Sequence, residues 1–202
     1  MGVVLKARFW GRAAVLATAG VLWTLAVGAY ASGRRSSGPR IGIHVGSFKP
    51  NCLAPQPSVS PFDEQAARPW SGLLFATPAF SGTSLRLGVG CWSKGGEEPI
   101  TLVPVALDVE HELVPGLPVQ PYVAYGVAAH WGWTVGWRHL GSQPPIARGY
   151  GATLGVGLHL SFARHWTAST EFDLLFVKLR RPLAGHDDFS GPRLSAGLLY
   201  LF

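Results

Sequence analysis

The chain has 202 residues, which is enough for one domain with a sizeable core. Hydrophobic residues make up 48% of it and charged residues only 14%, and its aromatic content of 11%, with 8 tryptophans, excludes a disordered chain. The net charge of +6 falls to +3 without the three basic residues before position 13, so we expect no nucleic-acid partner.

The first 31 residues have the pattern of a secretory signal peptide. Three basic residues precede an uncharged apolar stretch, residues 13–26, and the small-x-small pattern Ala29-Tyr30-Ala31 follows it. An uncleaved anchor helix is the alternative, because residues 13–31 are just long enough to span a bilayer. Residues 32–40 are then a polar N-terminal segment, and residues 41–202 form the mature domain.

The first half of the mature domain contains four segments with the alternation of β-strands. Residues 41–46 and 85–90 alternate aliphatic residues with glycine, histidine or arginine, and residues 103–110 alternate valine or leucine with proline, alanine, aspartate and glutamate. Residues 70–80 fit less well, because three consecutive apolar residues blur the alternation and Pro78 cannot donate to a ladder. We include this segment because a single-chain bacterial barrel needs an even number of strands.

The second half contains four more such segments, and two of them alternate over 14 residues or more. In residues 119–133 and 149–162 one face is mainly apolar, and the other carries mainly glycine, alanine and polar residues. Residues 168–176 and 193–202 continue the pattern to the last residue. A helix would scatter these side chains around its circumference, so the period of two indicates strands.

Transmembrane strands alternate lipid-facing apolar residues with small or polar residues facing the lumen. The sequence therefore predicts an all-β fold: a closed antiparallel eight-stranded transmembrane β-barrel, up-and-down, preceded by the signal peptide. Long and short links between the segments mostly alternate, as expected for such barrels. A soluble barrel or sandwich is the alternative, but its wetted face would be unusually rich in glycine and poor in charge.

The C-terminal strand carries the features of a known class. Leu198, Tyr200 and Phe202 share one face, and in this respect the chain resembles the small outer-membrane barrels of the OmpA-like and OmpW-like type. Residues 46–51 and 102–125 are also similar to outer-membrane β-barrel proteins of soil and predatory proteobacteria. The resemblance implies an outer-membrane location, and it implies that these three residues are the signal read by the outer-membrane assembly machinery. It implies no catalytic residues.

Charged residues on the inward-facing positions require partners inside a narrow lumen. Eight strands enclose only enough room for side chains, and a buried charge without a partner is strongly destabilising. We therefore expect an ion-pair network, with His44, His130 and His159 as neutral neighbours. Its members are Arg86, Asp108, Glu110, Glu171, Asp173 and Arg193. The alternative for the same cluster is a gated ion path or a proton-linked switch.

The two cysteines fall near the outer rim of the expected barrel. Export permits a disulfide between Cys52 and Cys91, although the alternation turns Cys91 toward lipid. Two free thiols are the alternative.

Basic residues gather at the outer links and their edges, at the height of lipopolysaccharide phosphates. Arginine pairs well with phosphate oxygens, so lipopolysaccharide is a candidate partner, and a solvated basic rim without a ligand is the alternative. The candidate contacts are Arg138, Arg148, Lys178, Arg180 and Arg181.

One short motif raises the question of catalysis. His159-Leu160-Ser161, with Glu171 nearby, resembles the His-x-Ser plus acid of lipid A deacylases, but the alternation places it inside the barrel near the periplasmic end. No metal-ligand spacing or cofactor motif is present. We expect a monomeric, non-enzymatic outer-membrane barrel that contributes to envelope structure or surface interaction through its outer loops. A lipid A deacylase and a narrow channel for ions or small solutes are the alternatives.

Overall fold

The computed structural model describes residues 38–53, 67–80, 82–95, 99–114, 117–134 and 146–202. The predicted signal peptide, residues 1–31, lies outside them. The described residues form nine strands and one short 3-10 helix: β1 (Arg40–Phe48), η1 (Asn51–Leu53), β2 (Arg68–Phe80), β3 (Thr83–Lys94), β4 (Ile100–Glu112), β5 (Val119–Thr134), β6 (Ala147–Ser161), β7 (Trp166–Leu183), β8 (His186–Asp188) and β9 (Gly191–Leu201). In this part of the chain no helix is long and apolar enough to cross a bilayer.

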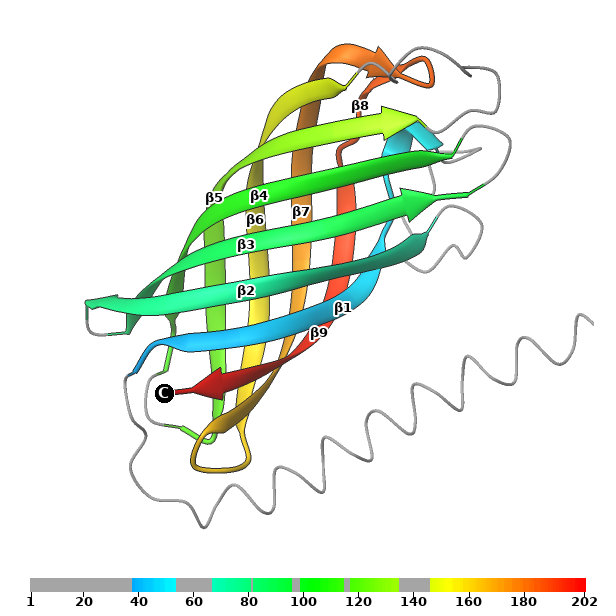
Figure 1. Ribbon diagram of the computed structural model, residues 1–202. Helices are drawn as coiled ribbons and strands as arrows, with labels where there is room; N and C mark the ends of the chain where they lie inside the picture. Colours follow the sequence, from blue (N-terminus) through cyan, green and yellow to red (C-terminus); the bar gives the residue numbers. More distant parts are fainter. Residues whose placement is uncertain (1–37, 54–66, 81, 96–98, 115–116, 135–145) are drawn as a thin grey trace, which may run out of the picture.

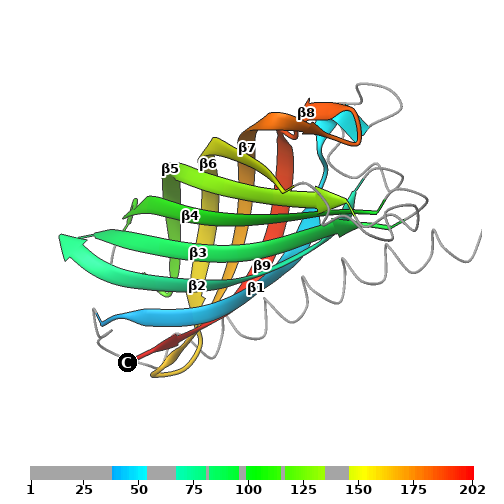
Figure 2. The ribbon, with the colours of Figure 1, turned by 45° about the horizontal axis from the view of Figure 1, so that its top comes forward.

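Eight of the strands form one closed antiparallel sheet. Strands β1 to β7 pair in chain order, β9 pairs with β7, and β9 also pairs with β1 from Arg40–Leu201 to Phe48–Arg193. Figure 1 shows the resulting barrel with its strands steeply tilted, and Figure 2 shows the same wall from a second direction. Closure leaves no unpaired edge among the eight strands, and the predicted fold class is confirmed.

The two ends of the barrel differ in their connections. The start of β1, the end of β9 and the short β6–β7 turn lie together at the end that is lowest in Figure 1, which we call the inner end. The end of β1, the start of β2, the end of β5, the start of β6 and strand β8 lie at the opposite end, the outer end, so the strand ends joined by the longer β1–β2 and β5–β6 links are there. Short connections at one end and longer ones at the other are typical of outer-membrane barrels.

The two faces of the sheet follow the predicted alternation. Aliphatic side chains on the outside are widely exposed, including Ile43 (56%), Val127 (62%) and Leu154 (52%). Glycine and polar residues face the lumen, where space is tight. Gly157, for example, lies against the Tyr122 ring, which a Cβ atom at this position would overlap. The apolar outer surface is a belt that only hydrocarbon can solvate well.

Strand β2 contains the segment that fits the predicted alternation least well, residues 70–80. Leu73 and Phe75 point outward, and Leu74 between them is buried in the lumen. The run of three apolar residues thus keeps the alternation, because the lumen accepts a leucine at this height. Pro78 is tolerated because it lies near the inner end, where the β2–β3 register shifts between Pro78 and Phe80.

The outer end of β7 differs from the expected long loop. Strand β7 continues to Leu183 and turns back into β8 through Ala184 and Gly185, whose φ values are +51° and +82°. Positive φ at both central residues is the geometry of a tight hairpin turn, for which Asn-Gly or Asp-Gly is the usual signal. The Ala-Gly sequence lacks that signal, so the hairpin was not predicted.

The outward-facing belt yields a first testable prediction. Leu154 lies at the centre of β6 and Tyr150 lies four residues nearer the outer end, on the same face of the same strand. We expect Leu154→Arg to lower the free energy of unfolding by about 2–4 kcal/mol, because it places a charge in mid-bilayer. Tyr150→Arg is the matched control, with a much smaller loss. Denaturant titration of the barrel folded into lipid vesicles measures both, and equal losses would contradict the assigned depth.

Candidate functional site

The candidate site is the lumen of the barrel, which the inward-facing side chains of the strands line. Arg86 lies at the centre of one group of ion pairs there. Arg86 extends from β3 across the lumen to Glu171 on β7, with Nη2 at 3.0 and 2.7 Å from the two carboxylate oxygens. Its Nη1 donates to Glu110 on β4 at 3.4 Å, and the hydroxyl of Tyr122 donates to Glu171 at 2.9 Å. Arg86, Glu110 and Glu171 are each no more than 3% exposed. One guanidinium thereby joins three strands of the barrel.

Arg193 forms a second centre near the middle of the lumen. It lies directly opposite Asp173 across the β7–β9 ladder, and its Nε and Nη2 reach the same carboxylate oxygen at 2.9 and 2.8 Å. The guanidinium also lies over the ring of Trp70, 4.3 Å from its centroid. Its Nη2 is 4.0 Å from Glu171, which links this pair to Arg86. The predicted network between the two arginines and the acids is therefore present.

Arg40 is a third arginine of this network that the sequence did not reveal. It was assigned to the polar segment before the barrel, but it is the first residue of β1 and its side chain is only 10% exposed. It donates to Glu110 at 2.8 Å, to Ser84 at 3.1 Å and to the His159 ring at 3.0 Å. The parity of β1 could have identified it, because Ile41 faces outward and its neighbour must then face inward.

Asp108, His44 and His130 form no ion pair with another described residue, whereas His159 is bonded to Arg40. Asp108 accepts a hydrogen bond from the Thr153 hydroxyl, and no arginine of the described residues is bonded to it. His44 contacts the Ser169 hydroxyl at 3.4 Å. His130 differs from the expectation, since its Nδ1 has no hydrogen-bond partner within the described part of the chain.

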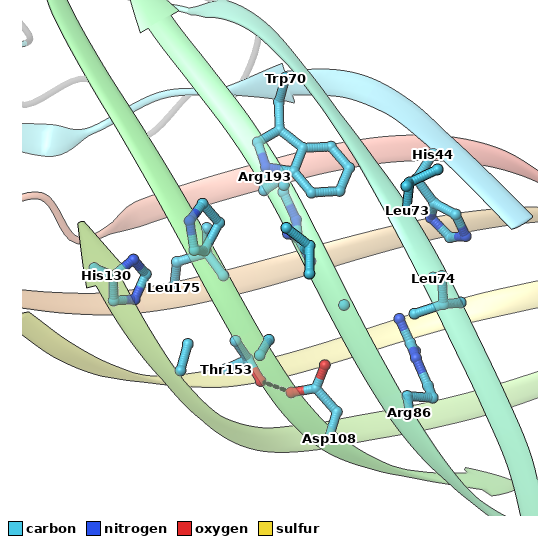
Figure 3. Close-up of a pocket in the computed structure, with 16 residues that line it drawn as sticks. His44, Trp70, Leu73, Leu74, Arg86, Asp108, His130, Thr153, Leu175 and Arg193 are labelled. Carbon is cyan, nitrogen blue, oxygen red and sulfur yellow. Dashed lines mark hydrogen bonds between the residues drawn. The ribbon is translucent and has the colours of Figure 1, made fainter. Parts of the chain in front are cut away.

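A small cavity separates these groups, as Figure 3 shows. Its volume is about 40 Å³, which is room for about three water molecules. The polar side chains that line it are His44, Arg86, Asp108, His130, Thr153 and Arg193. Pockets for organic ligands usually measure about 300–1,000 Å³, so this cavity is a small gap in a packed interior.

The outer half of the lumen is apolar, which corrects the expectation of a polar interior throughout. Phe48 and Trp92 pack edge to face with ring centroids 5.7 Å apart, and Phe189 packs on Trp92 at 6.4 Å. These rings and the aliphatic residues around them form a buried cluster that we call the outer plug: Phe48, Trp70, Trp92, Ile100, Leu102, Ala147, Leu175, Val177, Leu179, Leu183 and Phe189. Phe189 follows β8, so the missed hairpin supplies part of the plug.

One set of side chains in the lumen has the composition of a metal site. Ligand atoms of Glu110, Glu112 and His159 all lie within 4.8 Å of one another. The Arg40 guanidinium lies among them, bonded to Glu110 and His159 and 3.9 Å from Glu112. A metal ion would have to displace this resident positive charge. Spacing along the sequence could not find the set, because its members come from β4 and β6.

The three residues that resemble a deacylase motif do not form a catalytic arrangement in the structure. His159 is 2% exposed and bonded to Arg40, and the Ser161 hydroxyl bonds to Thr167 at 3.1 Å. Glu171 is bonded to Arg86 and Tyr122. Serine hydrolysis needs a serine within hydrogen-bond reach of the histidine, with an acid to orient it.

The two cysteines are free thiols in the structure, so the disulfide that export would permit is absent there. Cys52 in η1 is half-buried against the outer plug, and burial raises the pKa of its thiol to about 11. Cys91 lies on the outward face of β3, as the alternation indicated. The two side chains are thus on different sides of the barrel wall, which agrees with the alternative of two free thiols.

The remaining predicted residues lie on the outside of the barrel. Leu198, Tyr200 and Phe202 follow one face of β9 at the inner end, where Tyr200 packs against Phe202 with centroids 5.5 Å apart. Their role in assembly stays a prediction. Of the candidate lipopolysaccharide contacts, Arg138 lies outside the described residues. The others are exposed at the outer end of β6 and β7: Arg148, Lys178, Arg180 and Arg181.

The buried pair of Arg86 and Glu171 yields a second prediction. Arg86→Met leaves Glu171 without its main partner in the lumen, so we expect the free energy of unfolding to fall by about 3–5 kcal/mol. Arg86→Met combined with Glu171→Gln should recover part of this loss, because the uncompensated charge is then gone. Lys178→Met is the control, since its pair with Asp187 lies on the surface at 53% and 48% side-chain exposure. Unfolding in urea from vesicles measures all three, and an equal effect of the control would contradict the assignment.

Comparison with known proteins supports the fold. No protein-family model and no curated protein matches the chain by sequence. The structure is similar to that of Neisserial surface protein A, with a TM-score of 0.64 and 12% identity over 82% of this chain and 98% of that one. OprG from Pseudomonas aeruginosa matches with a TM-score of 0.55 and 15% identity, over 83% and 97%. Ail of Yersinia pestis, solved in complex with the heparin analogue sucrose octasulfate, matches with a TM-score of 0.54 and 11% identity, over 83% and 100%. The chain therefore has the fold of the small eight-stranded outer-membrane β-barrels.

Proposed function

We propose that the protein is a monomeric, non-enzymatic barrel of the bacterial outer membrane, exported by residues 1–31, that acts in envelope structure or surface interaction through its outer links. The observation that carries this proposal is the filled lumen. Ion pairs occupy the inner half and the outer plug occupies the outer half. With the interior occupied in this way, the surfaces left to meet a partner are the outer links and the outer wall.

The location is supported by the outer surface of the barrel. The aliphatic belt needs hydrocarbon around it, and bacterial barrels of this fold, such as OprG, are outer-membrane proteins. The monomeric state is supported by closure, since the closed sheet offers no strand edge on which a second chain could pair.

The channel alternative is disfavoured by the outer plug. A conducting path would have to cross the packed rings of Phe48, Trp92 and Phe189, of which none is more than 1% exposed. The deacylase alternative is disfavoured by the separate bonding of His159 and Ser161 and by the depth of His159 inside the barrel.

Two measurements on the refolded protein test these alternatives. We expect no reproducible unitary conductance in planar bilayers, because the lumen is plugged. We also expect mass spectrometry of lipopolysaccharide incubated with the protein to show every acyl chain retained. Unitary steps would contradict the plugged lumen. Loss of an acyl chain that His159→Ala or Ser161→Ala abolishes would establish an enzyme instead.

A third measurement tests the role of the outer links directly. Residues 54–66 and 135–145 are replaced by short glycine-serine linkers, and the variant is produced in cells that lack the native protein. We expect the variant to fold, which heat-modifiable gel migration checks. We also expect cells that produce it to have the same envelope permeability and the same lack of adhesion as cells that lack the protein altogether. Insertion of glycine and serine into link 113–118 at the inner end is the matched control and should preserve function. Full activity of the shortened variant would refute the proposal.

A further inference from the structure

We propose that the outer end of the β6–β7 wall binds the phosphate groups of an acylated glycolipid, lipopolysaccharide, between Arg148 and Arg180. This inference rests on the proposed outer-membrane location and adds a specific partner to it. It uses the outer wall of the barrel, so it does not depend on the outer links.

The register of the sheet places the two arginines side by side. Trp131 on β5 is paired with Arg148 on β6, and Gly149 on β6 is paired with Leu179 on β7. In an antiparallel ladder the next rung outward brings Arg148 opposite Arg180. Both side chains are exposed and have the outward parity of their strands.

The two arginines have no acidic partner among the described residues, although β8 places two acids next to β7. No hydrogen bond or ion pair joins Arg148 or Arg180 to another described residue. Asp187 forms an ion pair with Lys178, with 2.7 Å between Oδ2 and Nζ. The carboxylate of Asp188 accepts a hydrogen bond from the Ser190 N–H at 2.8 Å. Like charges directly opposite each other destabilise a sheet unless an anion lies between them. Guanidinium groups hold phosphate through paired hydrogen bonds, which makes phosphate the fitting anion.

The wall below the arginines fits the rest of a lipid. Two rungs inward are Tyr150 and Lys178, and two rungs further are Ala152 and Phe176, of which Phe176 is 53% exposed. The surface thus changes from basic to apolar along the strands, as it would beneath a headgroup and along acyl chains.

The opposite wall carries no basic residue at the outward positions of its described strands near the outer end. Arg68 and Lys94 lie at the outer ends of β2 and β3, but they have the parity of the inward-facing Trp70 and Trp92. The outward positions of β1 to β4 near the outer end hold uncharged side chains: Ser47, Ser71, Ser93 and Thr101. A general attraction to an anionic leaflet would not require outward-facing basic residues on one wall only. The asymmetry favours a bound lipid at one place on the circumference.

The test uses the full mature chain folded in neutral detergent and titrated with lipopolysaccharide, with tryptophan fluorescence as the readout. We expect Arg148→Gln with Arg180→Gln to weaken binding by at least about tenfold, because two charge-assisted contacts are lost. Arg148→Lys with Arg180→Lys should lose less, since lysine keeps the charge but not the paired hydrogen bonds. Arg164→Gln, an exposed arginine in the β6–β7 turn at the inner end, is the matched control and should bind as the unmodified protein does.

The outcomes separate this inference from the proposed function. Heat-modifiable migration in detergent alone checks that each variant folds. Equal binding by the Gln double variant, equal binding of dephosphorylated lipopolysaccharide, or displacement by an equal concentration of inorganic phosphate would each overturn the lipid site. None of these results would alter the effect of the shortened outer links, which tests the proposed function alone.

Discussion

Closure of the sheet between β1 and β9 is the constraint on which the rest of the structure depends. In hydrocarbon an unpaired backbone N–H or C=O is destabilising by several kcal/mol, so a sheet can cross a membrane only when it has no edge. Once eight strands close, each strand has one face in lipid and one in a narrow lumen. The alternation in the sequence and the small residues on the inward positions both follow from this geometry.

The lumen is then the core of the molecule, and it has two kinds of packing, one in the inner half and one in the outer half. In the inner half, Arg40, Arg86 and Arg193 each bond to carboxylates on other strands, so electrostatic contacts tie the wall together across its interior. In the outer half, aromatic rings and aliphatic side chains exclude water much as they do in a soluble protein. The change from one to the other occurs within single strands: β7 presents Glu171 and Asp173, and then Leu175 and Val177.

Much of this arrangement was predictable, because a period of two fixes which side chains share a face. The eight strands of the barrel, its closure and the meeting of Arg86, Arg193, Glu110, Glu171 and Asp173 in the lumen all follow from parity. The choice of partners among them does not, since Arg86 bonds to β7 across the lumen and bypasses Asp108, its neighbour on β4. Arg40 was missed because the apolar pattern begins one residue later. The apolar outer half was missed because the predicted segment ends at residue 176, whereas β7 continues with the inward Val177, Leu179 and Leu183.

The position of Arg193 opposite Asp173 bears on how the barrel reaches its final state. Strand β9 is the last of the eight barrel strands along the chain, and in the native alignment with β7 its inward arginine lies directly opposite Asp173. A slip of one residue would turn Arg193 toward lipid and leave Asp173 without this partner in the lumen, which is strongly destabilising. The buried pair therefore penalises a one-residue misalignment of the strand that closes the barrel.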